Sequence, residues 1–304
     1  LIPPERNLDI FWQDMTKNIL KEAGFTEVYN YSFFGEKEVK LFGYRTEELI
    51  EVENPLSIEQ KYLRPSLIPN LLKNVEKNQK NFSEIKIFEL GKTFKNLKIG
   101  REKMVLTGVL VGDEFYQAKG VIDLVLNKLG IGNIWYDEYQ PTPEESKLSI
   151  WYPQKCAEIK INGEEIGFLG EVSSRILSGL NIQGKIILFD FDFEKLSKLA
   201  SEEHEYRPVS RYPAAVRDIA VLVPRFVRVD EVLNKIYDTG GSLIRDIDLF
   251  DIYEGEELPE GKKNLAFHII FQAEDKTLSS KEIDEIQNKI IKTLEKNPEW
   301  QVRR

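Results

Sequence analysis

The chain has 304 residues, 41% of them hydrophobic and 31% charged, which is ordinary for a globular protein and enough for two domains. A formal net charge of −9 argues against a general nucleic-acid binder, and one cysteine and two histidines exclude a disulfide framework and a His-rich metal site. No apolar run approaches the roughly 18 residues of a membrane helix and no secretory leader is recognisable, so we expect a cytoplasmic protein.

The first two-thirds of the chain alternates between helical and strand patterns. Apolar residues at helical spacing predict a helix from Leu8 to Ala23, followed by Gly24 as a C-terminal cap. Alternating β-formers predict a strand from Phe25 to Phe33. Further predicted elements are helices at 67–81 and 118–129, strands at 85–94, 104–111 and 186–193, and a hairpin at 158–172 around Asn162-Gly163.

The polar stretch from Ser201 to Arg211 is the predicted linker, and we place the domain boundary between residues 206 and 207. Beyond it, the pattern predicts strands at 218–223, 243–253 and 264–271, helices at 229–237 and 280–294, and a last strand at the chain end. The order strand, helix, strand, strand, helix, strand is that of a ferredoxin-like (RRM-like) α+β domain. Domains of this form often hold single-stranded RNA.

The predicted strand at 264–271 alternates between two faces. Leu265, Phe267, Ile269 and Phe271 form the expected buried set, which turns Asn264, Ala266, His268 and Ile270 to the other face. Tyr253 ends the preceding strand and can stack on a base, and Asn264 can read a base edge. Four arginines can meet phosphates: Arg211, Arg217, Arg303 and Arg304.

Each of these residues also has a plainer interpretation. A tyrosine at a strand end is commonly a packing residue, an outward histidine is commonly inert, and terminal arginines are commonly solvated. Residues 211–304 hold 15 Lys/Arg against 18 Asp/Glu, so RNA contact must come from a local patch and must be sensitive to salt.

Four segments of the tail carry a family resemblance: RYPAAVRDIA, LFDIYEG, PEGKKNLAF and EWQVR. They resemble the C-terminal ferredoxin-fold anticodon-binding domain of the bacterial phenylalanyl-tRNA synthetase β subunit family. The resemblance implies that Tyr253, Asn264 and Arg303 lie near an anticodon base and that Arg211, Ala214 and Arg217 line the adjoining edge. We add His268, which the strand alternation turns to the same face, to the expected anticodon-binding residues.

Residues 1–206 are similar to the synthetase-like module of the same family, through ILKEAGFTEVYNYSF, the stretch from Val52 to Asn78, IKIFELGKTF and INGEEIGFLGEV. The implied fold is a class II synthetase-like antiparallel sheet with flanking helices. Ser173-Ser174 departs from the family's expected His-Pro pair.

Catalysis by a class II synthetase requires arginines that neutralise charge on the ATP phosphates. The nearest match to the first arginine segment is Phe94-Lys95-Asn96-Leu97, and the nearest match to the second, Gly184 to Phe193, contains no arginine. Lysine does not replace a bidentate arginine. We therefore predict a non-catalytic copy of the fold, with no catalytic residue in this chain.

The implied function is a part of phenylalanine–tRNA ligase that scaffolds a catalytic α subunit, in a heterotetramer of two α and two β subunits, and binds tRNA(Phe). The whole enzyme uses ATP and magnesium; we expect this chain to bind neither, to hold no metal and to lack editing activity. The expected α-subunit interface is helix Leu8–Ala23 and the stretch Asn54–Asn78, although Phe11, Trp12, Leu67 and Leu71 also suit an internal core. Two alternatives remain: an interaction protein without RNA binding, and a small-molecule binder that uses the remnant pocket.

Overall fold

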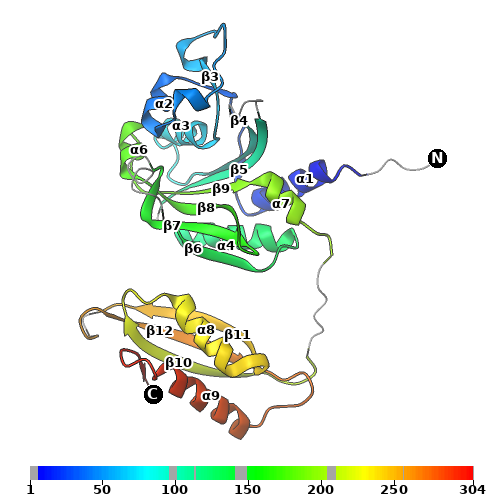
Figure 1. Ribbon diagram of the computed structural model, residues 1–304, viewed down its shortest axis with the longest axis vertical. Coiled ribbons are helices and arrows are strands. Elements are labelled where there is room, and N and C mark those ends of the chain that lie inside the picture. Colours follow the sequence, from blue (N-terminus) through cyan, green and yellow to red (C-terminus); the bar gives the residue numbers. More distant parts are fainter. Residues whose placement is uncertain are drawn as a thin grey trace, which may run out of the picture. The chain divides into compact units, whose positions relative to one another are not determined.

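The structure is a computed structural model that describes residues 6–95, 101–112, 114–140, 149–203, 210–255 and 257–303. The chain forms two compact units, Leu1–Glu205 and Tyr206–Arg304 (Figure 1). The boundary that we predicted between residues 206 and 207 lies outside the described residues, as does most of the predicted linker. Each unit has its own hydrophobic core.

A seven-stranded sheet forms the centre of the first unit. The strands in spatial order are β1 (Thr26–Glu27), β4 (Lys86–Lys95), β5 (Arg101–Val111), β9 (Ile186–Asp192), β8 (Glu164–Val172), β7 (Trp151–Ile161) and β6 (Ile134–Glu138). All neighbouring strands are antiparallel except β1 and β4, which run parallel. The predicted synthetase-like sheet is therefore confirmed, with one parallel pair at its edge.

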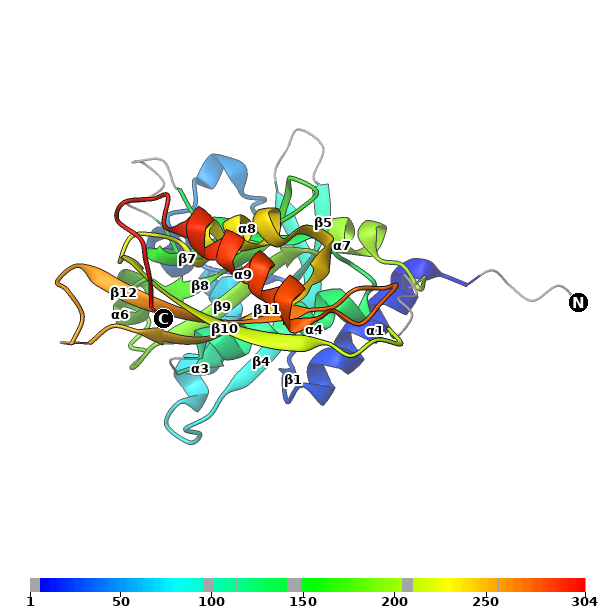
Figure 2. The same cartoon turned by 90° about the horizontal axis from the view of Figure 1, so that it is seen from below.

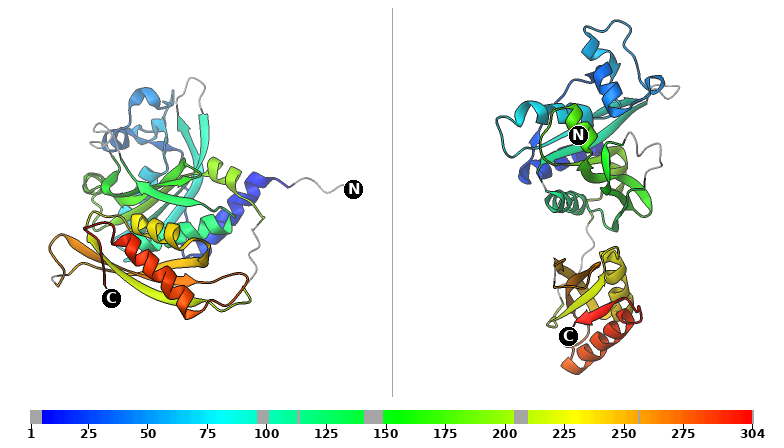
Figure 3. Two further views of the ribbon diagram at one scale, coloured as in Figure 1. Left: turned by 60° about the horizontal axis from the view of Figure 1, so that its bottom comes forward. Right: turned by 90° about the vertical axis from the view of Figure 1, so that its left-hand side faces the viewer.

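Helices cover both faces of this sheet (Figure 3). One face packs against α1 (Leu8–Glu22), α4 (Phe115–Lys128) and α7 (Phe193–Leu199), and the other against α2 (Glu36–Phe42), α3 (Ile68–Asn78) and α6 (Ser174–Gly179). Both faces carry apolar side chains, so the central strands are apolar in consecutive residues rather than in alternation. At Asn162-Gly163 the two positive φ values, 52° and 82°, form the predicted hairpin between β7 and β8.

The continuous strand predicted from Phe25 to Phe33 is wrong. The segment instead contains β1 and, separately, β2 (Phe33–Phe34), which pairs with β3 (Tyr62–Leu63) in a small two-stranded sheet beside two 3-10 turns, Thr46–Glu48 and Ile58–Gln60. Side chains from other elements bond the backbone between β1 and β2 at Asn30 and Tyr31, and no local sequence pattern reports such contacts.

The second unit has a four-stranded sheet covered on one face by two helices that lie side by side (Figure 2). Its elements are β10 (Ala215–Pro224), α8 (Val229–Gly240), β11 (Ile244–Tyr253), β12 (Lys262–Phe271), α9 (Ser280–Leu294) and β13 (Gln301–Arg303), with a short 3-10 turn, Gly241–Leu243, before β11. The spatial order is β11-β12-β10-β13. This arrangement confirms the predicted ferredoxin-like fold.

Candidate functional site

The face of the tail sheet opposite α8 and α9 is open, and cross-strand pairing arranges its residues in rows. The tyrosine row comprises Tyr253, Asn264, Leu222 and Gln301; the alanine row comprises Asp251, Ala266, Ala220 and Arg303; the histidine row comprises Asp248, His268 and Asp218. Strand residues between these rows, such as Val221 and Phe267, are buried under the helices. On the opposite face Tyr253 and Arg303 are exposed to a ligand, whereas Leu222, Asn264 and Ala266 are buried.

Tyr253 and Asn264 lie directly opposite each other in the tyrosine row. The Tyr253 side chain is 40% exposed, whereas Asn264 is 8% exposed and its Oδ1 has no hydrogen-bond partner among the described residues. A buried amide oxygen without a partner normally costs about 1–3 kcal/mol. Asn264 is thus more enclosed than the sequence predicted, and it holds an acceptor that a ligand could satisfy.

Gly255 makes room for the Tyr253 ring. A Cβ atom at residue 255 would lie 2.1 Å from the Tyr253 hydroxyl oxygen, so any side chain there would displace the ring. The glycine of the LFDIYEG segment therefore allows the tyrosine ring to adopt its observed position.

The alanine row has small side chains at its centre beside Tyr253, of which Ala220 is half-buried and Ala266 is buried. Ala220 and Ala266 are paired at its centre, with Arg303 at one end and Asp251 at the other. Small residues let a flat ring approach the sheet, and a guanidinium and a carboxylate at the ends can bind a phosphate and a base amino group.

The histidine row carries an aromatic residue that the sequence analysis missed, Phe250. Its ring stacks on His268, with centroids 3.9 Å apart and an interplanar angle of 14°. The His268 Nδ1 lies 2.7 Å from the Asp218 Oδ1. Phe250 lies within the LFDIYEG segment, at a β-bulge between Leu249 and Asp251 that the sequence pattern alone did not show.

The structure does not bring together all the predicted residues. Arg211 and Ala214 precede β10 and are exposed at the opposite end of the sheet, roughly 20 Å or more along the strand from the tyrosine row. Arg217 shares the helix side of β10 with Ile219, and its Nη2 lies 3.5 Å from Asp284 of α9. Arg304 lies outside the described residues.

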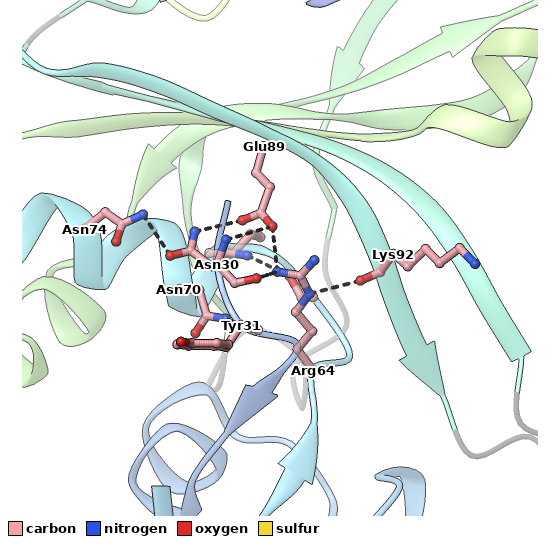
Figure 4. A network of polar contacts seen from close by, with 9 residues as sticks. Asn30, Tyr31, Arg64, Asn70, Asn74, Glu89 and Lys92 are labelled. Atoms are coloured by element: carbon pink, nitrogen blue, oxygen red, sulfur yellow. Dashed lines mark hydrogen bonds and ion pairs between the residues drawn. The ribbon is translucent and has the colours of Figure 1, made fainter. Parts of the chain in front are cut away.

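In the first unit, a buried polar network holds the segment between β1 and β2 (Figure 4). Arg64 Nη1 donates to Glu89 Oε1 at 2.7 Å and to the Asn30 carbonyl, and Arg64 Nε donates to the Lys92 carbonyl. Asn30 Nδ2 donates to Glu89 Oε2 at 2.8 Å, and Asn70 Nδ2 donates to the Tyr31 carbonyl at 2.9 Å. The segment is therefore clamped by side chains, with the Tyr29 and Tyr31 rings 75% and 79% exposed.

The strand that corresponds to the second phosphate-binding segment carries acids. On β9, Asp190 accepts a hydrogen bond from the Thr107 hydroxyl, and Asp192 pairs with Lys103 at 2.8 Å. Burial raises the pKa of the Asp190 carboxyl to about 6. Phe94 and Lys95 end β4, and Asn96 and Leu97 lie outside the described residues. Carboxylates on β9 would repel a triphosphate.

Comparison with known families agrees with both units. Residues 4–193 match the model of the phenylalanyl tRNA synthetase beta chain CLM domain, and residues 210–303 match that of the ferredoxin-fold anticodon binding domain. This chain belongs to the phenylalanyl-tRNA synthetase beta chain family. The resemblance seen in the sequence is therefore confirmed.

Curated members of this family resemble the chain over nearly its whole length. The phenylalanine–tRNA ligase beta subunits of Clostridium acetobutylicum and Moorella thermoacetica are each 30% identical, over 93% of this chain and 36% and 37% of their own lengths. That of Fusobacterium nucleatum is 30% identical over 99% of this chain and 39% of its own length. The chain thus spans less than two-fifths of the relatives it matches.

Solved structures of a similar fold cover part of the chain. Two structures of a pyrrolysyl-tRNA synthetase from Desulfitobacterium hafniense have TM-scores of 0.51 and 0.52 at 16% and 17% identity. They cover 62% and 63% of this chain, and the match spans 64% and 68% of theirs. At this identity the likeness concerns the fold alone.

In the part of the chain that the structure describes, no helix has the length and apolarity to cross a membrane.

Proposed function

We propose that this chain is the non-catalytic C-terminal portion of a phenylalanine–tRNA ligase beta subunit and binds the anticodon of tRNA(Phe) on the open face of its tail sheet. The observation that carries this proposal is the pair of Tyr253 and Asn264: an exposed ring beside an enclosed amide oxygen that has no partner in the part of the chain that the structure describes. An unpaired base could stack on the ring and donate to that oxygen. Arg303 is the proposed contact to an RNA phosphate. The residues Arg211, Ala214 and Arg217 lie away from Tyr253, so in this proposal they contribute only a secondary contact to the tRNA.

The test is a titration of the 304-residue chain with phenylalanine tRNA at low salt, beside the same tRNA with an altered anticodon. Tyr253→Ala should weaken binding about 5- to 150-fold, the effect of losing one stacked base. Tyr237→Ala is the matched control, because Tyr237 lies on α8 and is 39% exposed. Equal binding by all variants and both tRNAs would refute anticodon binding.

We also propose that the first unit holds a catalytic alpha subunit, as part of a heterotetramer of two alpha and two beta subunits. Trp12, Leu67 and Leu71 are buried in the core, so they are not part of this surface. The exposed apolar residues of the two expected segments are Leu8, Ile10, Leu56 and Ile58. Leu56 and Ile58, 94% and 70% exposed, are the sharper candidates.

Co-expression with the alpha subunit, followed by light scattering, tests this surface. The double variant Leu56→Asp/Ile58→Asp should abolish the complex, whereas Leu124→Asp on the exposed side of α4 should leave it intact. ATP, magnesium and catalysis are assigned to the alpha subunit in this proposal. ATP–pyrophosphate exchange by the chain alone would contradict it.

A second function is favoured by one observation, the acidity of the open face. Asp218, Asp248 and Asp251 lie on it, and carboxylates repel a phosphate backbone. A scaffold without RNA binding would retain the alpha subunit and show no anticodon-dependent binding in the titration.

A further inference from the structure

We propose that Phe250 and His268 form a second stacking platform on the tail sheet, which holds an unpaired base other than the one at Tyr253. The platform accepts a base with an exocyclic amino group: adenine, cytosine or guanine. This inference rests on the proposed anticodon binding and adds a second site to it.

The platform lies at the β-bulge in β11. Between Leu249 and Asp251 the pairing with β12 shifts, so that Leu249 lies opposite Phe267 and Asp251 opposite Ala266. Phe250 is the extra residue, and its ring lies over His268 on the open face, where it is 48% exposed. An aromatic pair of this kind offers a flat surface of the size of a base.

Asp218 fixes the orientation of the imidazole. Its Oδ1 lies 2.7 Å from the His268 Nδ1, and the two residues are direct neighbours across β10 and β12. The carboxylate restricts rotation of the ring, which keeps it parallel to Phe250. The platform is therefore ordered before a ligand arrives, which lowers the entropic cost of binding.

The surroundings select the kind of base. A hollow of about 630 Å³ adjoins His268 and is lined by Val216, Arg217, Asp218, Asp248, His268 and Ile270. Asp218 and Asp248 flank His268 on the two neighbouring strands. Carboxylates accept hydrogen bonds from the amino groups of adenine, cytosine and guanine. Uracil has no amino group, and its single N3–H donor is flanked by two carbonyl oxygens that would meet like partial charge, so it is disfavoured. The same carboxylates repel phosphate, so the base enters and its backbone stays at the rim.

The platform is separate from Tyr253. His268 is four positions along β12 from Asn264, which faces Tyr253, and this corresponds to a strand distance of roughly 13 Å. Ala266, between them, has no side chain that could bridge the two sites. One base cannot contact both rings, so the platform needs a different nucleotide.

The test uses the 304-residue chain and an RNA stem–loop with the phenylalanine anticodon, in which each loop nucleotide is replaced in turn by an abasic one. Phe250→Ala should weaken binding of the intact loop about 5- to 150-fold, and Phe250→Tyr should restore it. At one loop position, the abasic replacement should weaken binding to the native chain but should not weaken binding to Phe250→Ala any further. For Tyr253→Ala, the loop position at which the abasic replacement no longer affects binding should be a different one.

Base preference supplies a second readout. Uracil at the position assigned to Phe250 should weaken binding to the native chain, and Asp248→Asn should reduce this discrimination. His268→Ala, checked for an unchanged fold by circular dichroism, should behave as Phe250→Ala does.

Two results would overturn the inference while leaving anticodon binding intact: Phe250→Ala binding as well as the native chain while Tyr253→Ala is impaired, or both variants becoming insensitive to the same nucleotide. Failure of the native chain to distinguish the anticodon at all would instead refute the proposed function, and this inference with it.

Discussion

Arg64 Nη1 and Glu89 Oε1 lie 2.7 Å apart, with 6% and 3% of their side chains exposed. The pair joins the loop before α3 to β4, the strand next to the edge of the sheet, and also bonds the Asn30 backbone. A buried pair of this kind contributes little net stability relative to apolar side chains, but loss of one partner leaves a buried charge unpaired. It therefore determines the conformation of the segment around Asn30.

Arg64→Met and Glu89→Met should each lower the free energy of unfolding by about 3–5 kcal/mol. The double variant should lose less than the sum of the two, because neither charge is then left alone. Urea denaturation of all four proteins gives the coupling energy. Lys92→Met, which breaks the exposed pair with Glu102, is the control and should change stability by less than about 1 kcal/mol.

Asn264→Leu should raise the free energy of unfolding by about 1 kcal/mol while it lowers tRNA affinity. The substitution removes a buried oxygen that has no partner among the described residues. Urea denaturation and the tRNA titration measure the two effects on one protein. Asn234→Leu, on the exposed side of α8, should leave binding unchanged; a loss of stability in Asn264→Leu would show that the amide has a structural role.

Asp190→Asn should stabilise the fold at pH 7. Burial raises the Asp190 pKa to about 6, so the charged form is disfavoured in the folded state. This destabilisation is present above pH 6 and disappears as the pH falls towards the unfolded pKa of about 3.9. The variant keeps an oxygen for the Thr107 hydroxyl and should gain about 1–3 kcal/mol at pH 7. Denaturation at pH 4 should show no such gain.

Glu282→Gln should weaken the start of α9 at neutral pH. A hydrogen bond from Lys276, followed by those from the Ser279 backbone and hydroxyl, lowers the Glu282 pKa to about 2. Its stabilisation is complete above the ordinary pKa of about 4.5 and is lost as the pH falls to about 2. The native chain should lose stability over this window, and the variant should lose less of it. Glu285→Gln on the same helix should keep the native profile.

Local signals predicted the elements that depend on local contacts. The helix expected at 280–294 agrees with α9 to the residue, because the Ser279–Glu282 capping box and the spacing of Ile283, Ile290 and Leu294 are all within the segment. The prediction of a strand from Phe25 to Phe33 was wrong because the hydrogen-bond partners of this backbone include Glu89 and Asn70, which lie far away in the sequence. Composition cannot report such contacts.

Only part of the site could be predicted from the sequence, because the rest depends on contacts between strands. The alternation of Ile219 and Val221 on β10 already indicated that Arg217 lies on the helix side, a signal that the sequence analysis did not use. Strict alternation from Leu249 would have placed Tyr253 on the helix side as well. The β-bulge reverses this for Tyr253, and it depends on the register with β12 rather than on β11 itself.

The aspartates of β11 have a consequence for the whole chain. β11 is the outer strand of the tail sheet and is ten residues long, a length at which an exposed edge can recruit strands from other molecules. Asp246, Asp248 and Asp251 would face carboxylates of a second copy in an antiparallel pairing, and its two register shifts interrupt a regular ladder. The acidity that limits phosphate contact thus also protects newly made chains against edge-to-edge aggregation.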